Sequence, residues 1–116
     1  MAKDDYQVIA CKLLTYLYAC LKAGVNASAA KAQELAGCNN VYWAAVLDDL
    51  ADGKLIAVSA LHADGRRYVA IEEMRITLAG VEYLESNSAM KKVADVLGPA
   101  LPALVETAVA ATSLVC

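Results

Sequence analysis

The sequence predicts a mainly α-helical α+β domain that contains one β hairpin and ends in additional helices. Three helical segments precede residue 53, a two-residue Asp-Gly turn between alternating apolar residues follows, and more helical segments come after it. The chain has 116 residues, of which 59% are apolar and 20% are charged. This composition excludes intrinsic disorder, and the length suits one domain with its own core.

The first helix is expected to span residues 4–23 and to be buried around most of its girth. Apolar residues occupy most of the helical wheel, and Gly24 follows the last turn as a left-handed stop. The polar positions share one stripe of this helix: Asp5, Lys12, Thr15 and Lys22.

Two further helices are predicted between the first helix and residue 53. Asn26 or Ser28 is expected to cap an Ala-rich helix that ends at Gly37. Asn39 and Asn40 offer the next N-cap, and apolar residues then recur at helical spacing until Gly53 ends the run. The apolar positions expected in the core are Trp43, Val46, Leu47 and Leu50.

Residues 54–74 predict a β hairpin whose turn is Asp64-Gly65. Such a turn fixes the register of the two strands. It would place three pairs of residues opposite each other, namely Val58 with Ile71, Ala60 with Val69, and His62 with Arg67. The turn end of the hairpin would then be basic.

The segment after the hairpin predicts two capped helices and a terminal helix. Thr77 and Ser88 are the expected N-caps, and Gly98-Pro99 forms a break before the apolar end of the chain. The whole order is that of a winged helix-turn-helix domain with extra C-terminal helices, the third helix being presented and the hairpin forming the wing.

We expect a winged-helix domain over residues 1–92 and an apolar helical tail over residues 93–116. The tail carries a mostly apolar stripe after Gly98-Pro99. We expect this stripe to join two copies of the chain into a homodimer. The dimerisation residues predicted on it are Leu101, Leu104, Val105, Ala108 and Thr112.

One stretch of the sequence resembles a known family. The run from Arg75 to Glu85, followed by that from Asn87 to Lys92, is similar to the end of YjcQ-like proteins, and Tyr42-Trp43 and the entry Gly53-Lys54-Leu55-Ile56 agree with them. The resemblance covers roughly residues 4–92. It implies a winged-helix domain of a kind often carried by phages and prophages, and it implies no catalytic residue, cofactor or defined substrate.

The residue types that carry metal or enzyme chemistry are sparse. The four cysteines form no CxxC pair and His62 is the sole histidine, so no zinc-ligand spacing exists. Glu72 and Glu73 are neighbours on a strand and would point to opposite faces. No signal-peptide pattern begins the chain, and Asp95 and Glu106 interrupt the apolar end. We expect a cytoplasmic non-enzyme without metal, cofactor or membrane.

Two functions remain open, and charge separates them. The first, which the element order and the basic wing slightly favour, is a homodimeric DNA-binding or transcription-regulatory protein that contacts double-stranded DNA with its third helix and its wing. The second is a protein–protein interaction module that binds no nucleic acid. The nucleic-acid-binding residues predicted under the first are Asn39, Asn40, Tyr42, His62, Arg66 and Arg67.

The net charge of −3 argues mildly against DNA. The residues expected on or near the outer surface of the third helix are Asn39, Asn40, Tyr42, Ala45, Asp48, Asp49 and Asp52. Three of them are aspartates, and no Lys or Arg lies between Lys31 and Lys54. A positive band running from Arg66 and Arg67 toward Lys91 would favour DNA, whereas a negative third-helix surface would favour a protein partner.

Overall fold

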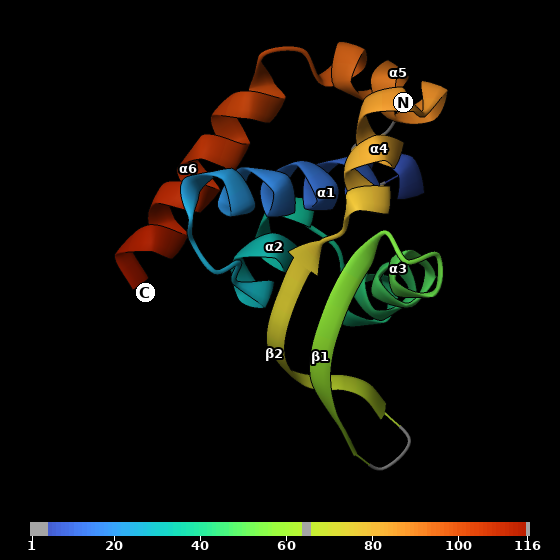
Figure 1. Cartoon of the computed structure of the whole chain (residues 1–116), viewed down its shortest axis with the longest axis vertical. Coiled ribbons are helices and arrows are strands. Elements are labelled where there is room, and N and C mark those ends of the chain that lie inside the picture. Colours follow the sequence, from blue (N-terminus) through green and yellow to red (C-terminus); the bar gives the residue numbers. More distant parts are fainter. Residues whose placement is uncertain (1–4, 64–65, 116) are drawn as a thin grey trace.

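The computed structural model describes the backbone of residues 5–63 and 66–115, and the side chains of residues 5–59 and 73–112. Three helices, a β hairpin and three more helices follow one another along the chain (Figure 1). The predicted class, mainly α-helical with one β hairpin, is confirmed. The elements are α1 (Tyr6–Ala23), α2 (Ala29–Ala36), α3 (Asn40–Asp52), β1 (Ile56–Ala63), β2 (Arg66–Ile76), α4 (Leu78–Ser86), α5 (Ser88–Leu97) and α6 (Ala100–Val115).

Helix α1 is the central element of the fold. It contacts the five other helices of Figure 1 and strand β2. Every residue from Val8 to Leu14 is buried, which confirms the helix predicted to be covered around most of its girth. Lys12 was expected on the polar stripe, but it is only 8% exposed. No described polar side-chain atom is buried without a partner, so the Lys12 stem is covered while its ammonium group reaches water.

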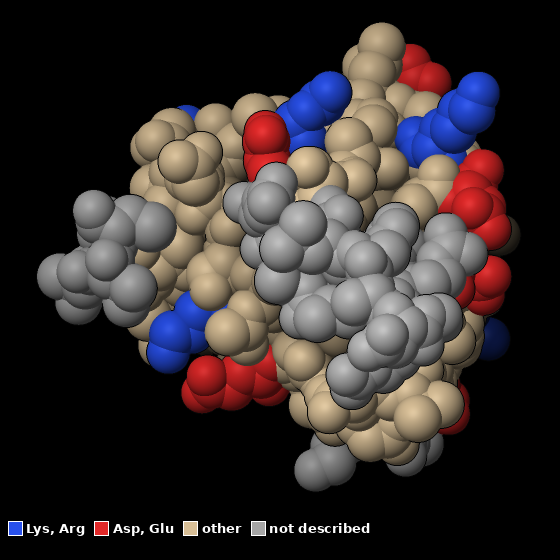
Figure 2. Space-filling model, turned by 90° about the horizontal axis from the view of Figure 1, so that it is seen from below, with Lys and Arg blue, Asp and Glu red and all other residues tan. Residues whose placement is uncertain are grey.

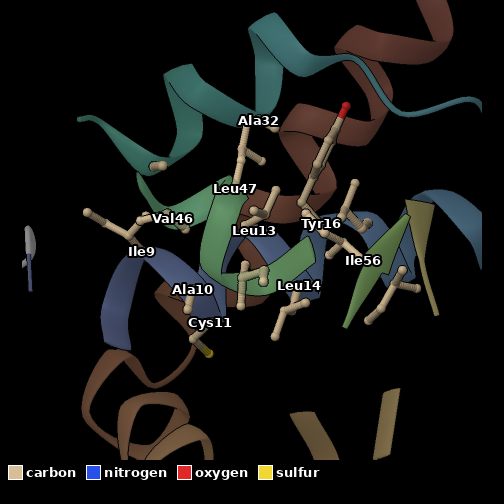
Figure 3. Packing of buried hydrophobic residues seen from close by; sticks show 14 of the residues in the cluster. Ile9, Ala10, Cys11, Leu13, Leu14, Tyr16, Ala32, Val46, Leu47 and Ile56 are labelled. Carbon is tan, nitrogen blue, oxygen red and sulfur yellow. The ribbon is translucent and has the colours of Figure 1, made fainter. Parts of the chain in front are cut away.

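The core forms where α1 meets α2 and α3. Ile9 and Leu13 of α1 lie in one cluster with Ala32 of α2 and with Val46 and Leu47 of α3 (Figure 3). All five side chains are buried. Burial of apolar area is the main stabilising term of folding, at about 25 cal/mol per Å². The Trp43 side chain is buried as well, as its helical spacing predicts.

Local capping signals set the ends of the first three helices. Gly24 ends α1 with a φ of 74°, and the Ser28 hydroxyl accepts a 3.3 Å hydrogen bond from the Lys31 N–H at the start of α2. The Asn39 side chain accepts a 2.8 Å bond from the Tyr42 N–H at the start of α3. Helix α3 ends at Asp52, as predicted, but the left-handed residue there is Lys54, with a φ of 60°.

The hairpin forms, but its register differs from the predicted one. Val58 lies opposite Met74 and not Ile71, and Ala60 lies opposite Ile71 and not Val69. Only Ala63 and Arg66 keep the pairing that a two-residue loop imposes, because the register shifts between Ser59 and Ala60 and again between Leu61 and Ala63. Strand β2 has 11 residues against 8 in β1. The extra residues of β2 are taken up by these irregularities, as in β-bulges.

The hairpin is joined to α4 through Thr77. The Thr77 hydroxyl donates to the Lys54 carbonyl oxygen at 2.6 Å and accepts from the Gly80 N–H at 3.0 Å, so Thr77 is the N-cap of α4 as predicted. The Thr77 N–H donates to the Leu55 carbonyl oxygen at 3.1 Å. These bonds hold the start of α4 against the segment that enters β1.

The N-cap of α5 is Asn87 and not Ser88. The Asn87 side-chain oxygen accepts from the N–H groups of Ala89 and Met90 at 2.9 and 3.2 Å. Ser88 is the first residue inside the helix. Asn and Ser are both good N-caps, so residue type alone does not decide between adjacent candidates.

We therefore expect Asn87→Ala to lower the free energy of unfolding by about 0.5–2 kcal/mol, the usual loss of an N-cap. Ser88→Ala is the matched control and should change it by less than about 0.5 kcal/mol, because Ser88 is exposed and lies inside the helix. Urea titration followed by circular dichroism measures both variants. An equal loss in the two would contradict the assignment of the cap.

Helix α6 returns along the molecule and packs on α1 and α2. A break at Gly98, with a φ of 57°, separates it from α5. Among the described residues, no single helix has the length and apolar character needed to cross a bilayer. Helices α5 and α6 have the length and composition needed for a membrane span only when they are taken together, and the pair is bent by 89°.

Candidate interaction surface on helix α3

Helix α3 has one buried face and one outward face. Trp43, Val46, Leu47 and Leu50 make the buried face. On the opposite side Val41, Ala45, Asp48 and Asp52 follow one another at helical spacing, and Asp49 lies beside them. We call these five residues the α3 outer face. Val41 is 82% exposed, which is unusual for a large aliphatic side chain.

The α3 outer face is acidic. Helix α3 contains three aspartates and no Lys or Arg. Asp49 and Asp52 are exposed, and Asp48 is half-buried. Acidic side chains lie along the edge of the molecule on the side of α3 (Figure 2). A helix with this charge repels phosphate groups and attracts a cationic segment.

The two asparagines at the start of α3 are both used inside the chain. The Asn39 side chain caps the helix through the Tyr42 N–H. The Asn40 side-chain oxygen accepts a 2.8 Å hydrogen bond from the Gln33 amide of α2. The capping role proposed for Asn39 from the sequence is confirmed, and Asn40 instead ties α3 to α2.

A tyrosine pair fixes the outer face to the start of α1. The ring centroids of Tyr6 and Tyr42 are 6.2 Å apart, with a 34° angle between the planes. The Tyr6 hydroxyl donates to Asp49 Oδ2 at 2.6 Å. Burial, and then the Asp49 carboxylate, raise the pKa of Tyr6 well above its usual range, so its hydroxyl stays protonated as a donor. Asp49 is thereby held in one orientation.

The structure brings together only part of the predicted nucleic-acid-binding set. Asn39, Asn40 and Tyr42 lie at one end of α3, while the side chains of His62, Arg66 and Arg67 lie outside the described residues. Helix α5 lies at the opposite end of the molecule from the residues at which β1 ends and β2 begins (Figure 1). A positive band from Arg66 and Arg67 to Lys91 of α5 would therefore have to run the length of the molecule.

The predicted dimerisation residues are largely covered within the chain. Leu101, Val105 and Thr112 are 6%, 3% and 0% exposed. Ala108 is half-buried, and Leu104 is 46% exposed. The apolar stripe of the tail thus packs on α1 and α2 of the same molecule. Dimerisation through α6 stays a prediction, and of these residues Leu104 offers the most surface to it.

The cysteine environments favour protonated thiols. Burial raises the pKa of the Cys11 thiol, against a smaller opposite effect of its contact with Thr15, and burial also raises the pKa of Cys38. A thiol with a raised pKa is a weak nucleophile at neutral pH. These residues behave as small packing groups, as their apolar surroundings suggest.

Val41 belongs to the α3 outer face but is not among the residues that the sequence predicted on the outer surface of this helix. Val41 lies seven and eleven positions before Asp48 and Asp52, so helical spacing places it on the same stripe. An apolar side chain near a helix start is ordinarily assigned to the core. The signal that identifies Val41 is therefore its spacing and not its residue type.

These observations define a helix-rich α+β domain with a small antiparallel hairpin and an acidic third helix. The chain belongs to the YjcQ protein family, whose family model matches residues 11–98. The match confirms the resemblance seen in the sequence and ends before α6 begins. No curated protein and no solved structure matches the chain.

Proposed function

We propose that this chain is a winged-helix protein-interaction module whose α3 outer face binds a basic segment of a partner protein. The single observation that carries the proposal is the pairing of a highly exposed Val41 with a row of aspartates on one helix face. Such a face supplies an apolar anchor within a charged surround. Protein interfaces are commonly built in this way, with an apolar centre and a polar rim.

The charge of α3 is the reason for preferring a protein partner to DNA. In the usual docking of a winged helix, the third helix enters the major groove beside two rows of phosphates. Each carboxylate held about 4 Å from a phosphate costs roughly 1 kcal/mol in water. A basic peptide segment converts the same contacts from repulsive to attractive. The element order still allows DNA binding through the basic residues near the turn, His62, Arg66 and Arg67, and this is the second candidate function.

A matched pair of double variants tests the proposal. Val41→Lys with Asp52→Lys removes the apolar anchor and brings the net charge of the α3 outer face to zero, whereas Val96→Lys with Asp95→Lys makes the same chemical change on exposed residues of α5. We expect the α3 variant to retain less than about a tenth of the partner captured by the native chain, which corresponds to about 1.4 kcal/mol of binding energy. The α5 variant should retain most of it.

The measurement is quantitative mass spectrometry of proteins captured from a nuclease-treated lysate of the native host. Equal capture by both double variants would refute the α3 surface. Fluorescence anisotropy with a labelled mixed-sequence DNA duplex at low ionic strength tests the second candidate. Salt-dependent binding that disappears in Arg66→Ala with Arg67→Ala, but survives in the α3 variant, would move the function to DNA.

A further inference from the structure

A hollow of about 440 Å³ lies beside strand β2, on a different part of the molecule from the α3 outer face. Its volume falls within the range of about 300–1,000 Å³ that is usual for ligand pockets. The end of α1, the segment between α1 and α2, and β2 form its walls. Its lining residues are Leu17, Cys20, Leu21, Val25, Asn26, Ala27, Glu73, Met74 and Arg75.

The hydrogen-bond pattern of the hairpin shows which backbone groups face this hollow. Opposed residues of an antiparallel pair alternate between hydrogen-bonded and non-hydrogen-bonded positions. The Thr77 N–H donates to the Leu55 carbonyl oxygen, in the same register that places Arg75 opposite Ala57. Leu55 and Thr77 are thus a bonded pair, and Arg75 and Glu73, two and four positions before Thr77, are bonded to β1 as well.

Met74 lies between these two bonded positions, so its N–H and C=O are directed away from β1. The next outward carbonyl along the strand, that of Ile76, accepts a 3.4 Å bond from Arg75 Nη1, which agrees with this assignment. Met74, backbone and side chain together, is only 3% exposed, and it lines the hollow. The peptide groups of Met74 therefore lie along the edge of β2 that faces away from β1.

Nothing in the described part of the chain pairs with that edge. Over residues 5–63 and 66–115 the sheet consists of β1 and β2 alone. Residues 25–28 lie between α1 and α2 in extended or irregular conformation, and no backbone hydrogen bond among the described residues joins them to β2. An edge with unpaired N–H and C=O groups is a template for an added strand.

The charges beside Met74 specify what such a strand would carry. Glu73 and Arg75 are exposed and stand on the same face of β2, because they are two positions apart. The only polar contact that the described residues give the Arg75 guanidinium is its bond to Ile76. The floor of the hollow on the other face is apolar, since Leu17 and Met74 line it and are buried.

We propose that the outer edge of β2 at Met74 is a second interaction site, which takes up an extended segment of a partner polypeptide as an antiparallel third strand. Its central residue is apolar and enters the hollow opposite Met74. An acidic residue precedes it and lies opposite Arg75, and a basic residue follows it and lies opposite Glu73. Antiparallel addition is the commoner mode of strand pairing. The proposal stands independently of the α3 outer face.

Selection of short random peptides on the folded chain, followed by NMR, tests the site. We expect the selected peptides to share the order acidic, apolar, basic. On addition of such a peptide, the Met74 N–H should gain protection from hydrogen exchange by about tenfold or more, since it becomes hydrogen-bonded. The Glu73 and Arg75 N–H groups, already paired with β1, should change little. A peptide with one N-methyl group at its central residue should lose this effect.

A charge-swapped variant distinguishes specific recognition of the peptide from nonspecific binding. Glu73→Arg with Arg75→Glu keeps the net charge and should reverse the preference, so that the order basic, apolar, acidic binds more tightly by about twofold or more. Glu82→Arg with Lys92→Glu, a swap of exposed residues elsewhere, should leave it unchanged. Failure to select any peptide, peptides of unrelated pattern, or binding that leaves the Met74 N–H unprotected would each overturn the proposal, whereas the α3 experiment would be unaffected.

Discussion

Gly80→Ala is expected to destabilise the protein by about 3 kcal/mol, at the upper end of the range for overpacking a core. A Cβ atom at Gly80 would overlap the carbonyl oxygen of Leu55 and stand 2.7 Å from Ile76 Cγ1. The first obstacle is backbone, which cannot turn aside as the end of a long side chain can. The Leu55 oxygen also accepts the Thr77 N–H, so moving it weakens the junction between β2 and α4.

The sign of this effect distinguishes close packing from helix propensity. Alanine in place of glycine inside a helix ordinarily stabilises it by about 1 kcal/mol. Ala79→Gly, at the exposed neighbouring position, is the control and should cost no more than about 1 kcal/mol. Chemical denaturation of the three proteins measures the differences. If Gly80→Ala raised stability, α4 would not lie against Leu55 as the structure has it.

The close approach at Gly80 also shows where sequence reasoning ends. The helix that contains Gly80 was predicted from its Thr77 cap, because capping depends on residues three positions apart. Nothing local indicates that Gly80 meets Leu55. The same division holds for the helix ends at Gly24 and Asn39, which were predicted because their signals lie within a few residues of each other.

The hairpin register could not be predicted because it depends on more than the turn. Asp64-Gly65 predicts a hairpin, and the pairing adjacent to it, Ala63 with Arg66, agrees with that turn. Farther along, Met74 and Ile76 are buried while the residues flanking Met74 are exposed. Burying those two side chains is a tertiary requirement, and the register irregularities reconcile it with the turn.

The surfaces of the molecule were likewise predictable where they depend on residues close in the sequence, and not where they depend on distant segments. The acidic residues of α3 were predicted to lie outward, because helical spacing separates them from the buried stripe. The hollow at the edge of β2 was not predicted, because it forms where the segment at Val25 lies beside Met74, and these two residues are far apart in the sequence. For α6 the apolar stripe indicated that a partner covers it. The stripe does not specify whether the partner is another copy or, as found, α1 and α2.

A buried chain of hydrogen bonds holds α6 in this place. The Ser28 N–H donates to the Tyr16 hydroxyl oxygen at 3.1 Å, and the Tyr16 and Thr112 hydroxyl oxygens are 2.6 Å apart. The Thr112 hydroxyl donates its one hydrogen to the Ala108 carbonyl oxygen at 2.8 Å. The Tyr16 hydroxyl must therefore be the donor to Thr112. Both hydroxyl-bearing side chains are fully buried, so each bond replaces one to water.

Tyr16→Phe is expected to lower the free energy of unfolding by about 2 kcal/mol. Phenylalanine fills the same space but leaves the Ser28 N–H and the Thr112 oxygen without their partner, and a buried polar group left unpaired costs about 1–3 kcal/mol. Tyr18→Phe is the matched control. Tyr18 is half-buried, its ring lies under the Lys22 ammonium at 4.4 Å, and the change should cost less than about 0.5 kcal/mol.

A double-mutant cycle identifies the bond as the cause. Thr112→Val removes the other side of the same contact, so the losses of Tyr16→Phe and Thr112→Val should overlap, and the double variant should lose less than their sum by about 0.5 kcal/mol or more. Denaturant titration measures the four stabilities, and hydrogen exchange should show α6 opening before α1 in each variant. Strict additivity would mean that the two hydroxyls do not interact, and α6 would then be held by its apolar residues alone.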